Sequence, residues 1–279
     1  MRFPSRCRWA VAVLLVDVAP LAAQSAPLSP VRERGQGVTP VFEGWYRNPD
    51  GSYSLSFGYF NRNQGEVVEV PLGRANFISP AAFDGGQPMR FHPRRHWGVF
   101  AVRVPADFGT RRVTWTVVFR GDSMVIPASL APDWQIDALE GEAGSGNTPP
   151  RLRFSVTGPE GAGPGGIQGG GVQGRVGAAV PIVVWAADDG NVRNSVASGG
   201  RSGVPVTLTW FKHQGPGQVT FGKATPEPDA DGRAATTATF SAPGEYVLRV
   251  RANDASGVES AGHSQCCWSN AFLKVTITP

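Results

Sequence analysis

The feature that most constrains the fold is a series of short stretches in which apolar and small polar residues alternate. In SYSLSFGYF, residues 53, 55, 57 and 59 are aromatic or aliphatic, and the residues between them are serine or glycine. Successive side chains of a strand point to opposite faces, so this alternation predicts a half-buried β-strand. The 36 glycines and 24 prolines separate such stretches, and long helical patterns are absent. The sequence therefore predicts an all-β protein with many turns.

The predicted strands fall into two series, which we interpret as two β-sandwich domains. About seven strands fit residues 38–139, and a second series occupies residues 151–279. Between them, EGEAGSGNTPP at 140–150 is small, polar and closed by two prolines, which is typical of a linker. Residues 25–39 are polar and contain proline, which favours a flexible arm. The later stretch GPEGAGPGGIQGGGVQG lacks the Gly-Lys-Ser/Thr that ends a phosphate-binding loop, so we expect a floppy surface loop there.

The first residues predict export. MRFPSRCRWAVAVLLVDVAPLAAQ has a basic start, a short apolar run and small residues, the order found in secretory signal peptides. Asp17 interrupts the apolar run, which is too short to span a membrane well; an uncleaved anchor is the alternative. We expect residues 1–24 to be removed and the mature chain, without a transmembrane segment, to be periplasmic or extracellular. The leader holds three of the 26 basic residues and one of the 22 acidic residues. The mature chain then has 23 basic and 21 acidic residues, a nearly neutral balance that does not favour binding to nucleic acid.

Removing the leader also removes Cys7 and leaves two adjacent cysteines, Cys266 and Cys267. They can bond to each other, bond to another chain, or stay as free thiols, one of them buried and one exposed. Neighbouring Cα atoms are about 3.8 Å apart, below the usual disulfide range of roughly 4.4–6.8 Å, so a bond between them is strained. It also requires the last strand to begin after the pair, near Ser269. We predict a vicinal disulfide in that loop.

Two stretches in the second series carry a resemblance. WFKHQGPGQVTF contains Trp210 on a predicted third strand, and TATFSAPGEYVLRVRA places Tyr246 directly after a Pro-Gly corner. Over about residues 180–278 they resemble polycystic-kidney-disease (PKD) type and related immunoglobulin-like domains of bacterial exported proteins. The resemblance implies a sandwich in which Trp210 is buried and the Tyr246 hydroxyl ties the corner to the backbone. Leu248 stands where antibody-type domains have their second bridging cysteine. Residues 38–139 resemble no family that we identify.

Such domains usually serve adhesion, spacing or ligand presentation, and their loops suggest where a ligand would bind. The loop after the second strand and the loop before the last one lie at the same end of an immunoglobulin-like sandwich. This placement predicts a cluster at one tip, formed by Asp188, Asp189, Asn191, Asp254, His263, Cys266, Cys267 and Trp268. The oxygens of Asp188, Asp189 and Asp254 suit calcium, although Asp and Asn are also ordinary turn residues. Trp268 can stack on a sugar ring, but packing is its default role.

A second candidate site is basic. MRFHPRRHW at 89–97 gathers Arg90, Arg94 and Arg95, whose guanidinium groups suit carboxylates or phosphates; a solvated loop is the alternative. His92 and His96 have the spacing of a metalloprotease pair, but Pro93 and the missing glutamate argue against a catalytic helix.

These observations predict a non-catalytic, exported binding or interaction module of the bacterial cell envelope, whose partner is an envelope protein or polysaccharide. Calcium is the only cofactor that the sequence suggests. The alternative is a structural accessory subunit that braces a larger envelope assembly, and a metal-assisted hydrolase is the least favoured reading. A large exposed apolar patch would favour the assembly role. A concave tip lined by Trp268 and the aspartates would favour a ligand.

Overall fold

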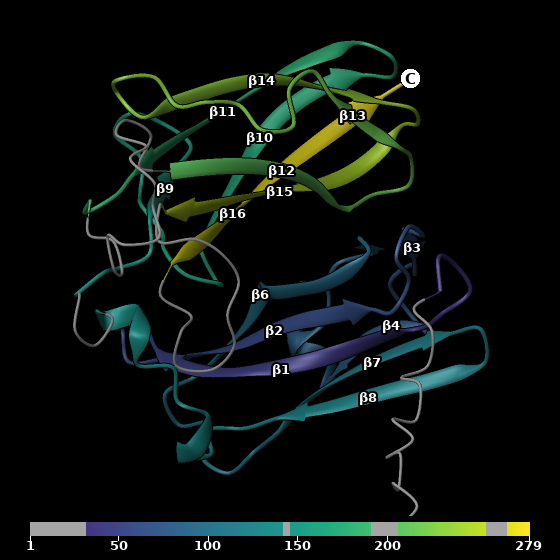
Figure 1. Cartoon of the computed structure of the whole chain (residues 1–279), viewed down its shortest axis with the longest axis vertical. Helices are drawn as coiled ribbons and strands as arrows, with labels where there is room; N and C mark the ends of the chain where they lie inside the picture. Colours follow the sequence, from purple (N-terminus) through teal and green to yellow (C-terminus); the bar gives the residue numbers. More distant parts are fainter. Residues whose placement is uncertain (1–31, 142–145, 191–205, 255–266) are drawn as a thin grey trace, which may run out of the picture. The chain divides into compact units, whose positions relative to one another are not determined.

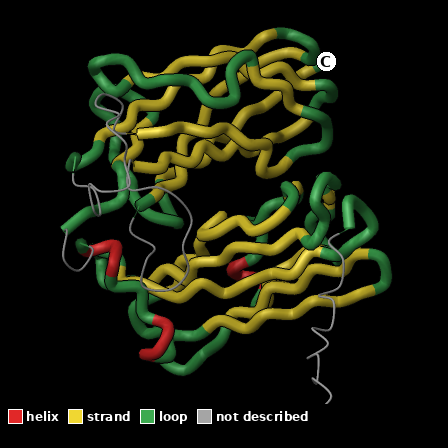
Figure 2. Tube along the Cα trace, in the orientation of Figure 1, coloured by secondary structure: helices red, strands yellow, loops and turns green. Residues whose placement is uncertain are grey.

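The computed structural model describes residues 32–141, 146–190, 206–254 and 267–279 (Figure 1). The predicted signal peptide, Asn191, His263 and Cys266 lie outside the described residues. Strands make up most of the described chain, and its helices are single 3-10 turns (Figure 2). These turns are η1 (Ala81–Phe83), η2 (Pro132–Trp134) and η3 (Ala138–Glu140). The predicted all-β class is thereby confirmed.

The first sandwich is built from two three-stranded antiparallel sheets and one short ladder. One sheet has the order β1-β2-β6, the other has the order β4-β7-β8, and β3 pairs with β5. The strands are β1 (Val38–Arg47), β2 (Tyr53–Asn61), β3 (Val68–Glu69), β4 (Asn76–Ser79), β5 (Arg90–Phe91), β6 (Arg94–Val104), β7 (Val113–Phe119) and β8 (Asp122–Ala128). Its core is aromatic: the rings of Phe57 and Phe100 stack, and both pack against the fully buried Trp115.

The second sandwich has two four-stranded sheets, in the orders β10-β16-β15-β12 and β13-β14-β11-β9. All neighbouring pairs are antiparallel except β10 and β16, which are parallel. The strands are β9 (Arg151–Arg153), β10 (Ile167–Arg175), β11 (Ala179–Ala187), β12 (Val206–Gln214), β13 (Val219–Phe221), β14 (Arg233–Phe240), β15 (Gly244–Asp254) and β16 (Trp268–Thr278).

The residues that carried the resemblance lie where it implied. Trp210 is 2% exposed and stacks on Phe221 in the core of the second sandwich. The Tyr246 hydroxyl donates to the carbonyl of Ala242 and accepts from the backbone N–H of Gly217, at 2.8 and 2.9 Å. These bonds tie the corner before β15 to the neighbouring turn, so the predicted tyrosine corner is confirmed.

The second half of the glycine-rich stretch is a strand, and the prediction of a floppy loop is wrong there; its first half, residues 158–166, is a loop. Residues Ile167–Arg175 form β10 and pair with β16 in parallel. Its glycines allow close packing: a Cβ at Gly169 would lie 2.3 Å from the Phe154 ring, and one at Gly174 would lie 2.3 Å from Val180. Glycine therefore serves here to bring a backbone against neighbouring side chains rather than to make a loop mobile.

The two sandwiches contact each other through the faces of β6, β15 and β16. Phe272 of β16 belongs to the core cluster of the first sandwich. Asn270 is fully buried and donates to the carbonyls of Gly98 and Pro164, at 2.6 and 2.9 Å. The serines of β2, expected on an open face, are buried as well, and Gly165 lies over Ser54. The sheet β1-β2-β6 is therefore covered on both faces.

Candidate functional site

An apolar groove of about 480 Å³ lies on the first sandwich, between β1 and β8. Each of these strands is the edge of its sheet, so the groove opens between two sheet edges. Its lining is mostly aliphatic and aromatic, and consists of Pro40, Val41, Phe42, Arg112, Ile126, Pro127, Ala128, Ser129 and Trp134. Concave, mostly apolar surfaces with a few polar groups are the usual form of a binding site.

Trp134 is the most prominent side chain of this groove, and the chain holds it in place. Half of its surface is exposed, which is unusual for a tryptophan next to a core. Its ring packs on Phe42 with centroids 5.4 Å apart. The segment that carries it is tied to β1 by two bonds of 2.7 Å: the Trp45 indole N–H donates to Ala131, and the Ile136 N–H donates to Trp45. The exposed ring is therefore presented in a fixed orientation.

Gly44 allows the segment that carries Trp134 to lie directly against β1. β1 has an irregularity between Phe42 and Gly44, where the strand register against β2 shifts. Gly44 has φ +125°, a conformation that favours glycine, and a Cβ there would lie 2.4 Å from the carbonyl oxygen of Trp134. Any larger residue would push the Trp134 segment away from β1.

The groove also has one charged residue, Arg112, which is exposed beside the apolar lining. No ion pair of Arg112 occurs within the described ranges. The two edge strands each contain a proline in the groove, Pro40 and Pro127, and proline has no backbone N–H to offer an added strand. The groove is therefore suited to side-chain insertion and to a carboxylate near Arg112, more than to extended strand pairing.

Sequence reasoning missed this groove because its wall comes from three segments that are far apart in the chain. Spacing within one strand holds no signal for it. The only local indication was Trp134 itself, an aromatic residue in the polar stretch APDWQID that follows the last strand of the first sandwich.

The predicted acidic tip is partly described. The linker crosses it: Asn147 is fully buried and donates to Asp254 at 2.7 Å and to the Cys267 sulfur at 3.5 Å. The hydroxyl and backbone N–H of Thr148 donate to Asp189, at 2.6 and 2.9 Å. The structure thus joins these aspartates to the linker. A ligand site at this tip stays a prediction.

Asp188 lies in the same region and accepts from the Gly190 N–H at 3.0 Å. Burial raises the pKa of the Asp188 carboxyl, and the neighbouring Asp189 carboxylate also raises it. Among the residues that the structure describes, no three His, Cys, Asp or Glu side chains are grouped to hold a metal ion.

Trp268 is 2% exposed. A Cβ at Gly98 would lie 2.9 Å from its indole ring, so the indole lies directly against the backbone of β6. Its Nε1 has no hydrogen-bond partner within the described part of the chain. This placement is the one expected for a packing residue, held between β16 and the first sandwich.

The three predicted anion-binding arginines all lie on the first sandwich. Arg90 pairs with Glu69 and donates to Gln218 at 3.0 Å. Arg95 pairs with the buried Glu43 at 2.7 Å. The guanidinium of Arg94 lies 5.4 Å from the centre of the Phe60 ring. Two of the three therefore already hold a carboxylate, and an anion site here stays a prediction.

Three histidines lie where the sandwiches meet. The His92 and His96 rings of the first sandwich lie 5.3 and 6.4 Å from the ring of Phe211 on β12. The guanidinium of Arg249 lies 4.6 Å from the centre of the same ring, on β15. His213 is buried, and its Nε2 lies 2.9 Å from the carbonyl oxygen of Gly86. The contact between the sandwiches is therefore polar as well as apolar.

Replacing Asn270 by alanine should lower the free energy of unfolding by about 2–4 kcal/mol. The change removes the donor to two buried carbonyls, and each buried group left without a partner costs roughly 1–3 kcal/mol. Denaturant titration measures the loss. Thr276→Ala is the matched control on the same strand, because its hydroxyl bonds only at the surface, to Glu245. Equal stabilities of the two variants would contradict the contact.

The fold defines the chain as two β-sandwiches in tandem, and the second has the buried tryptophan and the tyrosine corner of immunoglobulin-like sandwiches. Its sequence matches no family model and no curated protein. Solved structures similar to it include the D0-D1 domain of intimin, at 12% identity and TM-score 0.24, covering 86% of this chain and 97% of that one. Domains 4 and 5 of the S-layer protein SbsC match at 10% identity and TM-score 0.23, covering 88% and 98%. The fibronectin(III)-like modules of Clostridium thermocellum CbhA match at 9% identity and TM-score 0.24, covering 87% and 94%.

None of the helices in the described ranges has the length and apolar character needed to cross a membrane.

Proposed function

We propose that this chain is a non-catalytic, exported interaction module of the bacterial cell envelope, and that the groove between β1 and β8 holds an apolar segment of an envelope protein. The observation that carries the proposal is the half-exposed Trp134 ring, fixed over Phe42 at the wall of an apolar groove. An aromatic side chain that is already ordered binds at a lower entropic cost, and tryptophan is common among residues that dominate binding energy.

The chemistry of the groove selects the occupant. Its apolar lining fits aliphatic side chains, and the exposed Arg112 fits a carboxylate beside them. The prolines of both edges reduce the donors available for continuous strand addition. The occupant is therefore an extended apolar segment that carries an acidic residue and inserts its side chains. This occupant favours the accessory-subunit role over a polysaccharide ligand.

Trp134→Ala should weaken binding of the partner segment by about 30-fold. Truncating a dominant aromatic contact typically costs about 2 kcal/mol or more, and each 1.4 kcal/mol is tenfold in affinity. A photo-crosslinking residue at position 134 identifies the segment in intact cells. Calorimetry with the matching synthetic peptide then compares the wild type with Trp134→Ala and Arg112→Glu.

The control position is Val156, which is 66% exposed on the second sandwich. We expect crosslinks at position 134 only, to an apolar segment with an acidic residue. Equal crosslinking at both positions, a crosslinked segment without apolar character, or unchanged peptide affinity in Trp134→Ala would each contradict the proposal.

Export and the cysteine pair belong to the same proposal. Cys267 is 8% exposed and receives a bond from Asn147, and Cys266 lies outside the described residues. We expect the mature chain to begin between about residues 22 and 26 and to hold a vicinal disulfide between these cysteines. The intact mass of protein isolated without reductant checks both: it should match the cleaved chain and rise by two hydrogens on reduction. An uncleaved mass, a disulfide-linked dimer or two reactive thiols would contradict it.

A further inference from the structure

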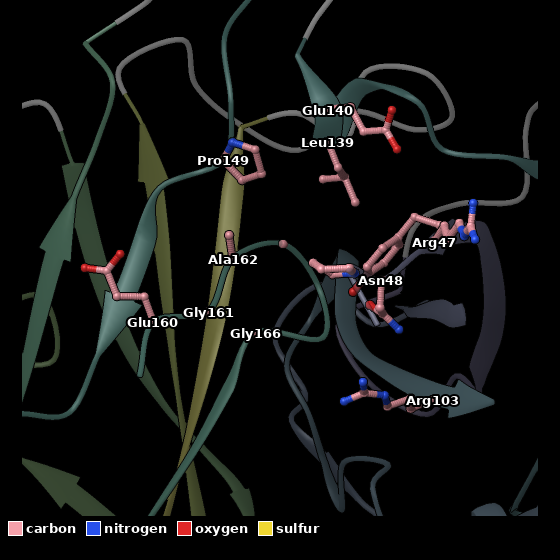
Figure 3. Close-up of a pocket in the computed structure, with 13 residues that line it drawn as sticks. Arg47, Asn48, Arg103, Leu139, Glu140, Pro149, Glu160, Gly161, Ala162 and Gly166 are labelled. Carbon is pink, nitrogen blue, oxygen red and sulfur yellow. The ribbon is translucent and has the colours of Figure 1, made fainter. Parts of the chain in front are cut away.

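A second cavity, of about 810 Å³, shares no lining residue with the groove and lies where several segments of the chain meet (Figure 3). The end of β1 contributes Arg47, the turn after it contributes Asn48, and the end of β6 contributes Arg103. η3 contributes Leu139 and Glu140. The loop before β10, which includes Glu160, forms what we call the third wall and comes from the second sandwich. Its volume is within the roughly 300–1,000 Å³ of small-ligand sites.

Two of the charged side chains that line this cavity form ion pairs, and two do not within the described residues. Arg103 pairs with Asp50, and Glu160 pairs with Arg153 at 2.9 Å. Arg47 and Glu140 are both exposed, and the described residues offer neither of them an ion pair. Figure 3 shows Glu140 on η3 and Arg47 at the end of β1, both among the residues that line the cavity. The cavity therefore presents one available cation and one available anion.

The third wall of the cavity is fixed by hydrogen bonds. The Gly163 N–H donates to the Ser269 hydroxyl at 2.8 Å, and the Gly163 carbonyl accepts from the Asn270 N–H at 3.0 Å. The Gly165 N–H donates to the Tyr46 hydroxyl at 2.9 Å. A wall held in this way loses little freedom when a ligand binds.

The chemistry of the lining favours a site that binds a peptide over a site that binds a sugar. Tyr46 is the one aromatic residue among those that line the cavity, and its hydroxyl already bonds to Gly165. Burial raises the pKa of Tyr46, which keeps this hydroxyl protonated. The Tyr46 ring is only partly exposed, so the cavity offers little aromatic surface to a sugar. Leu139 and Pro149 add a small apolar surface to the lining.

We propose that this cavity binds a short peptide with free termini, whose carboxylate pairs with Arg47 and whose ammonium pairs with Glu140. The site is independent of the groove that holds the partner segment, because the two cavities share no lining residue.

Calorimetry with the full mature chain tests the proposal. The probes are trialanine with free termini and the same peptide with an acetylated N-terminus and an amidated C-terminus. Trialanine should bind at least tenfold more tightly than the capped peptide, and Arg47→Ala and Glu140→Ala should each weaken it about tenfold. Arg74→Ala, which removes an exposed arginine outside the cavity, should leave it unchanged.

Trp134→Ala separates the two sites, since it should not change trialanine binding. The proposal is overturned if trialanine does not bind, if both peptides bind equally, or if neither cavity variant changes the affinity.

Discussion

Between pH 7 and pH 5 the protein should lose about 4 kcal/mol of its free energy of unfolding. This is a net value: three histidines that are buried in their neutral form lose about 6 kcal/mol together, and one buried glutamate returns about 2 kcal/mol. Burial is the main cause in each case and lowers the pKa of His96 and His213 to about 3 and that of His92 to about 4. Arg249 lowers the pKa of all three further.

Other charged groups act on the same histidines. Arg90 also lowers the pKa of His92, while Glu69 raises it. The pKa of His96 is lowered by His92 and Arg251 as well, and its bond with Pro93 opposes them. The bond between His213 and Gly86 likewise opposes the shift. These opposing effects are smaller than burial.

The direction of the pH effect follows from proton binding. An unfolded histidine has a pKa near 6.5, so below that pH the unfolded chain binds protons that the folded chain does not. The contribution of each buried histidine to the free energy of unfolding is complete above pH 6.5. It is lost as the pH falls toward the pKa of the folded state, by roughly 2 kcal/mol per histidine at pH 5. Glu43 acts in the opposite sense: burial raises its pKa to about 7, so it returns roughly 2 kcal/mol over the same range.

Denaturant titrations at pH 7, 6 and 5 measure this slope. His213→Gln should remove about a third of the histidine contribution while keeping a donor for the Gly86 carbonyl. An unfolding free energy that is constant from pH 7 to pH 5, in the wild type, would show that these histidines are not buried.

Replacing Trp210 by alanine should lower the free energy of unfolding by about 3–5 kcal/mol, the usual range for deleting a large buried aromatic side chain. Trp210 is 2% exposed and lies at the centre of β12, opposite Val250 of β15. Its ring packs on Phe221 of the facing sheet. The deletion therefore opens a cavity between both sheets of the second sandwich.

Trp134→Ala is the matched control, because it deletes the same side chain at a site that is half exposed. We expect a loss of about 1 kcal/mol or less from it. Thermal or denaturant unfolding of the two variants gives the comparison. A loss below 1 kcal/mol for Trp210→Ala would place that residue outside the core.

The strands could be predicted from the sequence because the residues on their core faces are apolar and recur at every second position. Trp210 and Tyr246 lie on such faces, and both were placed correctly. The faces between the sandwiches could not be predicted, because alternation does not distinguish a face exposed to water from one covered by a polar neighbour. Ser54 alternates with apolar residues and was expected on the open face of a half-buried strand, yet it is buried.

The candidate site was less predictable than the fold. Loop residues such as Asp189 and Asp254 were singled out for their chemistry, but the sequence did not show that Asn147 and Thr148 of the linker bond to them. The groove depends on Gly44 and on the hydrogen bonds of Trp45, whose effect appears only when β1 and η2 lie together.

The parallel pairing of β10 with β16 gives the second sandwich a directional resistance to force. The register runs from Ile167 opposite Ala271 to Arg175 opposite Thr278. A pull toward the C-terminal end of β16, opposed at the N-terminal end of β10, would slide the two strands past each other along their length. The hydrogen bonds between them would then be loaded in shear, all together, and would have to break together. An antiparallel edge pulled open from one end would peel apart bond by bond, so tension along β16 meets the stiffest direction of this sheet.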